Sequence, residues 1–465
     1  MAPLNPAAPG GKPVLPLRQI GLYAAVCITV GNIIGSGIFR SPHTVGQYLD
    51  TLPLVLGAWV LGGALSLCGS LALAELAVAR PKTGGLYVFI REGFGDAPGF
   101  AFGWANLWVI KPTLIASVIS VFALYFCQAL GIPEATRLPA GIAAILLLTF
   151  VNWLGVREGV RTQTLFTTLK VIGIAALCVC AFALPHAGPG AEAQEAVAAA
   201  GAVTGHPSVF IALVLAMIPI LFAYDGWTDV TFVAGEVKDP RRNLPVAILG
   251  GTVLVVAVYV LTNLAYYAVL TPAEVAAIAP VGSETVGRIL GGWGRQALAV
   301  LVAVSTFGTA NGSILTGPRV TQAMAADGLL WKPLAALDPK RATPALALWV
   351  QAVLSCAWLW ASNSFEDVSG WFVTTSWLFY ALTTAALFRQ RAREKRLGRP
   401  LSDYRTWLYP VTPVLFIIVT VVLIGSDLHD QGWRAGAGVL IAALGVPVYH
   451  WFWRGKARIV RDTEA

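Results

Sequence analysis

Long apolar runs, one after another, constrain this chain more than any other feature of its sequence. A helix needs about 20 consecutive apolar residues to cross the hydrocarbon core of a bilayer. The chain contains about twelve such runs, near 18–48, 53–79, 95–131, 138–154, 161–184, 208–236, 243–270, 293–325, 343–361, 368–389, 407–425 and 434–453. The sequence therefore predicts an all-α membrane protein with twelve transmembrane helices.

Composition and charge exclude several other classes of protein. Hydrophobic residues make up 57% of the chain and charged residues 12%, whereas soluble domains are about a quarter charged. The net charge of +8 would suit nucleic acid, but the basic residues lie in short segments between apolar runs, so no nucleic-acid partner is expected. The cysteines lie within apolar runs and the histidines are scattered, so we expect no metal, no cofactor and no enzyme active site.

The loop charges predict the orientation of the chain in the membrane. With the N-terminus in the cytoplasm, roughly two dozen Lys and Arg residues fall in inner segments and about five in outer ones. Twelve spans then leave both termini cytoplasmic. The first 16 residues lack the apolar core of a signal peptide and suggest a disordered tail. We expect a multi-pass protein surrounded by lipid bilayer.

Two of the apolar runs are interrupted near their middles. The first contains GNIIGSGIF at 31–39, and the sixth contains FAYDGW at 222–227. Small residues also allow close helix packing, and a buried acid can serve a bond between helices. However, a carboxylate at this depth costs a few kcal/mol unless it is paired or lines a wet cavity.

The positions of the two interruptions are the stronger signal. Each interrupted run opens a block of five spans, so the second block is inverted relative to the first. Interrupted helices at matching positions of inverted repeats indicate a transporter's binding site at the membrane midplane. The predicted segments are a tail (1–16), the first repeat (17–184), an outer loop (185–207), the second repeat (208–389), a basic cytoplasmic loop (390–406), two extra helices (407–453) and a cytoplasmic tail (454–465).

Unwound backbone at the two interruptions would expose both N–H groups and carbonyl groups. The freed N–H groups around Gly35 and Gly37 would face an anion, helped by a helix N-terminus. The freed carbonyls near Ile33 and Phe222 would face a cation. A site with both suits a zwitterion such as an α-amino acid.

Five motifs, GNIIGSGIF, PKTGGLYVFIREGFG, FAYDGW, GEVKDPRRNLPVAI and NGSILTGPR, together resemble the amino acid–polyamine–organocation superfamily. Within it, the chain is most similar to the L-type amino acid transporter branch, over about 17–423. The resemblance implies two inverted five-helix repeats with broken first and sixth helices, plus two C-terminal helices.

The resemblance also implies roles for individual residues. Ser36 and Gly37 would bind the substrate carboxylate, and the carbonyls of Ile33 and Phe222 would bind its ammonium group. The Phe222 ring would be the outer gate. Lys170 matches a lysine that touches the first break and replaces a sodium ion, which predicts sodium-independent transport. Snorkelling of Lys170 to the cytoplasmic interface is the alternative.

Two departures from the mammalian members of this branch bear on function. Those members have glycine where this chain has Asp225, next to Gly226. The Asp225 carboxylate would bind ammonium, favour cations or titrate, unless its side chain faces away. The outer connection GIPEATRLP has no cysteine, so no disulfide-linked heavy subunit is expected and the chain looks like a stand-alone member of a bacterial inner membrane.

Other residues have open interpretations. Lys111, beside Pro112, is interpreted as a packing or carbonyl-satisfying cation rather than a substrate ligand. Charges around Glu236 at the inner end of the sixth span suggest a cytoplasmic salt-bridge gate or solvated surface charge. The side-chain pocket is expected to draw on spans 3, 6, 8 and 10, with Val118, Thr228, Asn311 and Trp377 as candidates.

The sequence thus predicts a sodium-independent secondary transporter of neutral L-amino acids that works by alternating access, as an exchanger. Proton-coupled uptake, with Asp225 or Lys170 titrating, is the close alternative. A membrane-bound amino-acid sensor without turnover is the alternative from another class.

Overall fold

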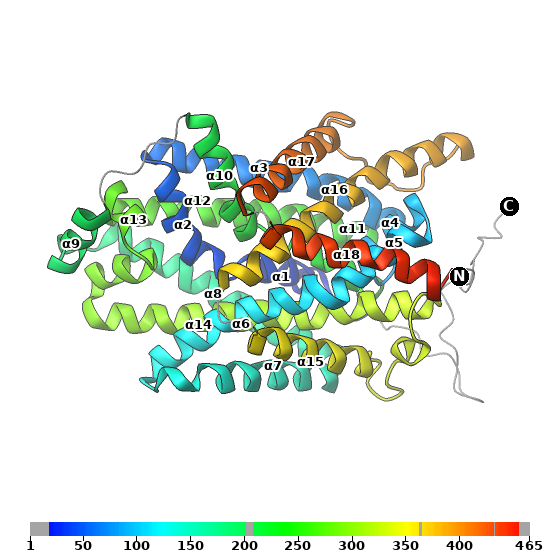
Figure 1. Ribbon diagram of the computed structural model, residues 1–465, viewed down its shortest axis with the longest axis horizontal. Coiled ribbons are helices and arrows are strands. Elements are labelled where there is room, and N and C mark those ends of the chain that lie inside the picture. The colour runs from blue at the N-terminus through cyan, green and yellow to red at the C-terminus, as the bar shows by residue number, and fades with distance from the viewer. Residues whose placement is uncertain (1–17, 201–207, 362–364, 432, 455–465) are drawn as a thin grey trace.

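The computed structural model describes residues 18–200, 208–361, 365–431 and 433–454. The predicted tail at 1–16 and nearly all of the predicted tail at 454–465 lie outside these ranges. The described chain is helical and contains no β-strand beyond one isolated parallel bridge between Ile20 and Val237. Figure 1 shows most helices running along the long axis of the molecule. The predicted all-α class is confirmed.

The helices reproduce the predicted order of spans. Nine are long and apolar enough to cross a bilayer, and three shorter apolar helices occupy the remaining span positions of the described chain. In order they are α1 (Leu22–Ile33) with α2 (Gly37–Tyr48), α3 (Leu52–Ala79), α5 (Asp96–Ala105) with α6 (Lys111–Leu130), α7 (Arg137–Leu154), α8 (Val156–Ala183), α10 (Val209–Ala223), α11 (Pro240–Pro245) with α12 (Gly251–Val269), α14 (Val281–Ala326), α15 (Ala345–Ala361), α16 (Phe365–Leu397), α17 (Val411–Gln431) and α18 (Trp433–Phe452).

The connections contain short helices. The segment PKTGGLYVFIREGFG contains α4 (Leu86–Phe94), which packs against α5 and α16. The connections before α10 and after α12 contain α9 (Ala191–Ala200) and α13 (Pro272–Ala277), which lie together at one end of the molecule (Figure 1). A capping box between Thr271 and Glu274 starts α13, because the threonine hydroxyl and the glutamate satisfy backbone N–H groups that a helix start leaves free.

A π-helical turn (η1, Asn106–Ile110) interrupts the third span just before Lys111. Pro112 has no N–H, so the carbonyl of Trp108 lacks its usual helical donor. The indole of Trp358 donates to that carbonyl at 2.9 Å. The turn and this cross-helix bond hold Lys111 at mid-span, in the interior of the bundle.

Candidate substrate site

The first predicted break lies between α1 and α2. Helix α1 ends at Ile33, Ile34 has non-helical angles (φ −76°, ψ 87°), and α2 begins only at Gly37. The first N–H groups of α2 have no acceptor within their own helix. The Ser36 hydroxyl is buried and has no hydrogen-bond partner among the described residues. This stretch therefore presents unpaired donors in the interior of the protein.

The second break follows α10. That helix ends at Ala223, and the chain turns through 224–228 before a 3-10 segment, η3 (Asp229–Glu236). Gly226 has φ +116°, a conformation that only glycine adopts readily. A Cβ atom there would lie 2.6 Å from the carbonyl carbon of Asn32, and one on Gly37 would lie 2.5 Å from the Cα of Ala223. Glycine thus lets the two breaks pack backbone against backbone.

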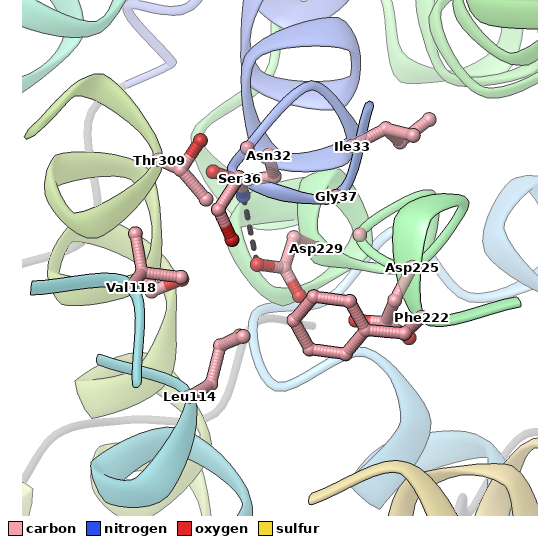
Figure 2. Close-up of a pocket in the computed structure, with 13 residues that line it drawn as sticks. Asn32, Ile33, Ser36, Gly37, Leu114, Val118, Phe222, Asp225, Asp229 and Thr309 are labelled. Carbon is pink, nitrogen blue, oxygen red and sulfur yellow. Dashed lines mark hydrogen bonds between the residues drawn. The ribbon is translucent and has the colours of Figure 1, made fainter. Parts of the chain in front are cut away.

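A cavity lies where the two breaks meet (Figure 2). All seven residues predicted for the substrate site line it. The full lining is Asn32, Ile33, Gly35, Ser36, Gly37, Leu114, Val118, Phe222, Asp225, Gly226, Asp229, Thr309 and Ser313. The first, third, sixth and eighth spans supply these residues.

The carbonyls expected to receive the ammonium group already have protein donors. The hydroxyl of Tyr259, on α12, lies 3.0 Å from the carbonyl oxygen of Ile33 and 2.8 Å from that of Ala223, so it bridges the two breaks. The Phe222 carbonyl accepts from the N–H of Asp225 at 3.2 Å. The Ile33 carbonyl also accepts from the N–H of Gly35 at 2.9 Å, so both of its lone pairs have protein donors. The role assigned to Ile33 and Phe222 stays a prediction.

Lys170 is fully buried and reaches the first break. Its Nζ lies 2.9 Å from the carbonyl oxygen of Gly31, 2.6 Å from that of Ile34 and 2.8 Å from that of Ser305. The hydroxyl oxygen of Thr309 is 3.0 Å away. The snorkelling alternative is therefore wrong, since the ammonium group sits among four neutral oxygens in the interior.

The Asp225 side chain faces the cavity. Tyr380 donates a hydrogen bond to one carboxylate oxygen at 2.7 Å. The side chain is largely buried and lies close to Phe222 and Asp229 in Figure 2. The role of this carboxylate in substrate binding stays a prediction.

Comparison with known proteins decides the family. A model of the family "Amino acid permease" matches residues 20–441. The chain belongs to the amino acid permease family. It is 33% identical over 443 residues to the serine/threonine exchanger SteT of Bacillus subtilis (strain 168), covering 95% of this chain and 98% of that protein.

Mammalian relatives support the same assignment. The permease is 34% identical over 455 residues to Asc-type amino acid transporter 1 of Mus musculus, covering 96% of this chain and 84% of that protein. It is 33% identical over 451 residues to b(0,+)-type amino acid transporter 1 of Rattus norvegicus, with coverages of 95% and 89%. The predicted resemblance to the amino acid–polyamine–organocation superfamily and its L-type branch is confirmed, and the permease is an amino acid transporter rather than an enzyme.

The prediction of side-chain pocket residues was partly wrong. Val118 lines the cavity, but Thr228, Asn311 and Trp377 do not. Asn311 instead bonds Asn152 and Gln163 in the packing of spans 4, 5 and 8. Trp377 packs against the rings of Tyr380 and Phe416.

Sequence reasoning missed Asp229, which lines the cavity four residues after Asp225. Its partner is Lys111, at 2.6 Å, which we had expected to satisfy carbonyls. A second acid in the DGWTD stretch was a usable signal, because a charge at this depth needs a partner.

Contacts on either side bound the cavity. On one side, Arg319 and Glu236 form a buried ion pair at 3.1 Å, and the Ile20–Val237 bridge joins spans 1 and 6. The Phe222 ring meets Phe372 edge-on at 6.3 Å between centroids. The charge at Glu236 is therefore buried and paired, not solvated.

Proposed function

We propose that the permease exchanges neutral L-amino acids across the membrane by alternating access, without sodium. The observation that carries this proposal is the buried cavity between two facing helix breaks. One side offers the Ser36 hydroxyl and the free N–H groups at the start of α2, and the other offers the Asp225 carboxylate. A zwitterion with its two charges on one carbon matches that arrangement.

In this proposal the substrate carboxylate binds Ser36 and the N–H of Gly37, with Gly35 allowing close approach. The ammonium group lies between the Asp225 carboxylate and the carbonyls of Ile33 and Phe222. Asp225 is the stronger acceptor, because hydrogen bonds to a charged group are roughly twice as strong as neutral ones. The Phe222 ring closes over the substrate from the outer side.

Lys170 supports independence from sodium. Four oxygen atoms surround its Nζ within 3.0 Å, and oxygen atoms are the ligands that hard cations prefer. A fixed ammonium group there performs the structural role of a bound ion, since it holds the unwound stretch of span 1 against spans 5 and 8.

The exchange mode is supported by the relative described as a serine/threonine exchanger. Substrate binding draws the halves of the broken helices together, after which the bundle of spans 1, 2, 6 and 7 rocks against the rest. An obligatory exchanger makes this movement only with a substrate bound.

We also propose that the permease works in a bacterial inner membrane, with cytoplasmic termini and without a disulfide-linked heavy subunit. The excess of Lys and Arg in inner segments supports the orientation. The connection between the third and fourth spans contains no cysteine, so it offers no thiol for such a bond.

The buried Asp225 carboxylate favours proton-coupled uptake as a second candidate. A carboxylate that takes up a proton on one side of the membrane and releases it on the other would drive net accumulation without internal substrate.

Uptake of a labelled amino-acid panel into proteoliposomes, in sodium-free buffer, separates the candidates. Uptake only into vesicles preloaded with amino acid is the expected result. Uptake into empty vesicles that grows with an inward proton gradient would establish coupling instead. Saturable binding without any uptake would indicate a sensor and overturn the transport proposal.

A further inference from the structure

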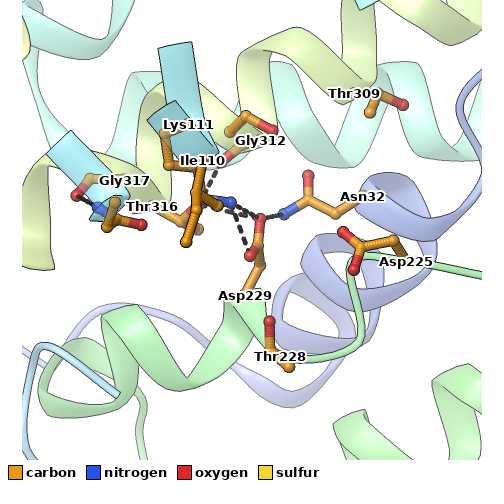
Figure 3. A network of polar contacts seen from close by, with 12 residues as sticks. Asn32, Ile110, Lys111, Asp225, Thr228, Asp229, Thr309, Gly312, Thr316 and Gly317 are labelled. Atoms are coloured by element: carbon orange, nitrogen blue, oxygen red, sulfur yellow. Dashed lines mark hydrogen bonds and ion pairs between the residues drawn. The ribbon is translucent and has the colours of Figure 1, made fainter. Parts of the chain in front are cut away.

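The cavity wall contains a compensated ion pair that faces the substrate. Asp229 lines the cavity, and both of its carboxylate oxygens receive bonds from the Lys111 ammonium group, at 2.7 and 2.6 Å. Figure 3 shows the two side chains pointing at each other from spans 3 and 6. Only 2% of Lys111 and 3% of Asp229 is exposed. The pair is therefore shielded from bulk water, and its charges are felt strongly nearby.

The carboxylate is held in place by further neutral contacts. The amide of Asn32 donates to one Asp229 oxygen at 2.7 Å, and the Thr316 hydroxyl lies 3.2 Å from the same atom. These bonds come from spans 1 and 8. They fix the position of Asp229 on the wall without changing its charge.

Lys111, in contrast to Asp229, has no additional neutral hydrogen-bond partners in the described chain. Within the described chain its ammonium group donates hydrogen bonds only to Asp229, and it lies 5.2 Å from the centre of the Phe232 ring. The π-helical turn before it and Pro112 after it fix its place on the helix. Loss of Lys111 thus leaves a bare anion on the cavity wall, and loss of Asp229 leaves a bare cation behind it.

The two cavity carboxylates differ in whether a charged side chain neutralises them. Asp225 has a neutral hydrogen-bond partner, Tyr380, and remains available to the substrate ammonium group. Asp229 is neutralised by Lys111. Beyond one ammonium group, the cavity therefore has no net charge to offer a substrate.

We infer that the Lys111–Asp229 pair determines the charge selectivity of the site by excluding substrates with a charged side chain. A basic side chain would find no unpaired acid beyond the one that holds the substrate ammonium group, because Asp229 is paired with Lys111 behind the wall. An acidic side chain would meet the carboxylates of Asp229 and Asp225. Lys111 and Asp229 are thus specificity-determining residues. The inference rests on the proposed transport of amino acids at this cavity.

The test compares uptake of labelled alanine, lysine and glutamate by wild type, Lys111→Met and Asp229→Asn in preloaded proteoliposomes. Wild type is expected to carry alanine alone. Lys111→Met should raise the ratio of lysine to alanine uptake by at least about tenfold, because one buried charge is uncompensated. Asp229→Asn should shift the ratio toward glutamate instead.

Two control variants separate charge from structural damage. Lys111→Arg keeps the charge and should keep selectivity for alanine. The double variant Lys111→Met with Asp229→Asn removes both charges and should also carry alanine alone. Thermal shift of each purified variant with alanine, lysine or glutamate reports binding even where turnover is slow.

Each outcome decides the inference. It is overturned if Lys111→Met binds and carries alanine with no gain for lysine. It is also overturned if Lys111→Met handles neither substrate while the double variant still handles alanine, since the pair would then serve structure alone. If wild type itself carries and binds no amino acid, the proposed function fails first, and that result is distinct from either of these.

Discussion

The two buried lysines of this permease, Lys170 and Lys111, have different kinds of partner in the interior. Lys170 is surrounded by three carbonyl oxygens and one hydroxyl, all neutral. Lys111 is paired with a carboxylate at 2.6 Å. Lys170 therefore leaves a net positive charge beside the first helix break, whereas Lys111 leaves none.

The difference shows how each lysine serves the site. A cation held by backbone oxygens organises an unwound segment, as a bound metal ion would. A cation held by an acid cancels the charge of that acid. From sequence, the family resemblance implied the place of a sodium ion for Lys170, whereas Lys111 was interpreted as a packing or carbonyl-satisfying cation.

Replacing Lys170 should have the largest effect. Lys170→Met removes several charge-assisted hydrogen bonds, each worth about 1.5–3 kcal/mol, so we expect exchange to fall by at least about 100-fold. In Lys170→Ala the vacated oxygens leave room for an ion. Exchange by that variant should recover partly in sodium chloride and not in choline chloride. Exchange by Lys170→Met at the wild-type rate would contradict the role given to Lys170 at the first break.

The second prediction concerns the stability of the Lys111–Asp229 pair. Breaking a buried pair by removing one partner costs about 3–5 kcal/mol, whereas replacing both partners is often nearly neutral. Lys111→Met should therefore lower the melting temperature in detergent by several degrees. Adding Asp229→Asn should restore most of the loss. Additive losses in the double variant would show that the two residues do not act as a pair.

The smallest expected effects come from a matched pair of threonines on α14. The Thr309 hydroxyl oxygen lies 3.0 Å from the Lys170 Nζ and 2.9 Å from the Gly31 carbonyl oxygen. The Thr316 hydroxyl lies closer to the Gly312 carbonyl, at 2.9 Å, than to Asp229, at 3.2 Å. Thr309→Val should cost about 1.5–3 kcal/mol and Thr316→Val about 1 kcal/mol or less.

These two variants share a helix and a chemical change, so their difference isolates the surroundings. Melting temperature and exchange rate should both fall more in Thr309→Val than in Thr316→Val. Equal effects would mean that the neutral site of Lys170 is no more sensitive to the loss of one oxygen than the paired site of Lys111.

Much of this architecture could be predicted from sequence, because a bilayer imposes strong local rules. Span length, loop charge and interrupted apolar runs are read from neighbouring residues, and they gave twelve helices and both breaks. The motifs supplied the cavity residues from Ile33 to Gly37 and from Phe222 to Gly226.

The sequence did not predict which side chains of different spans contact one another. Lys111 and Asp229 are 118 positions apart in sequence, and no local pattern links them. The π-helical turn at Asn106–Ile110 also shifts the phase of span 3, since it adds a residue to a turn. Facing directions on helices 8 and 10 depended on packing in the same way, so Asn311 and Trp377 were misplaced.

The most direct test of the whole account is a cryo-EM map of the permease with a neutral amino acid in sodium-free buffer. We predict ligand density in the cavity between the breaks, with its carboxylate at Ser36 and Gly37 and its ammonium group facing Asp225. The Lys170 side chain should fill the oxygen cage beside the first break. Ligand density away from this cavity, or a Lys170 ammonium group outside that cage, would contradict it.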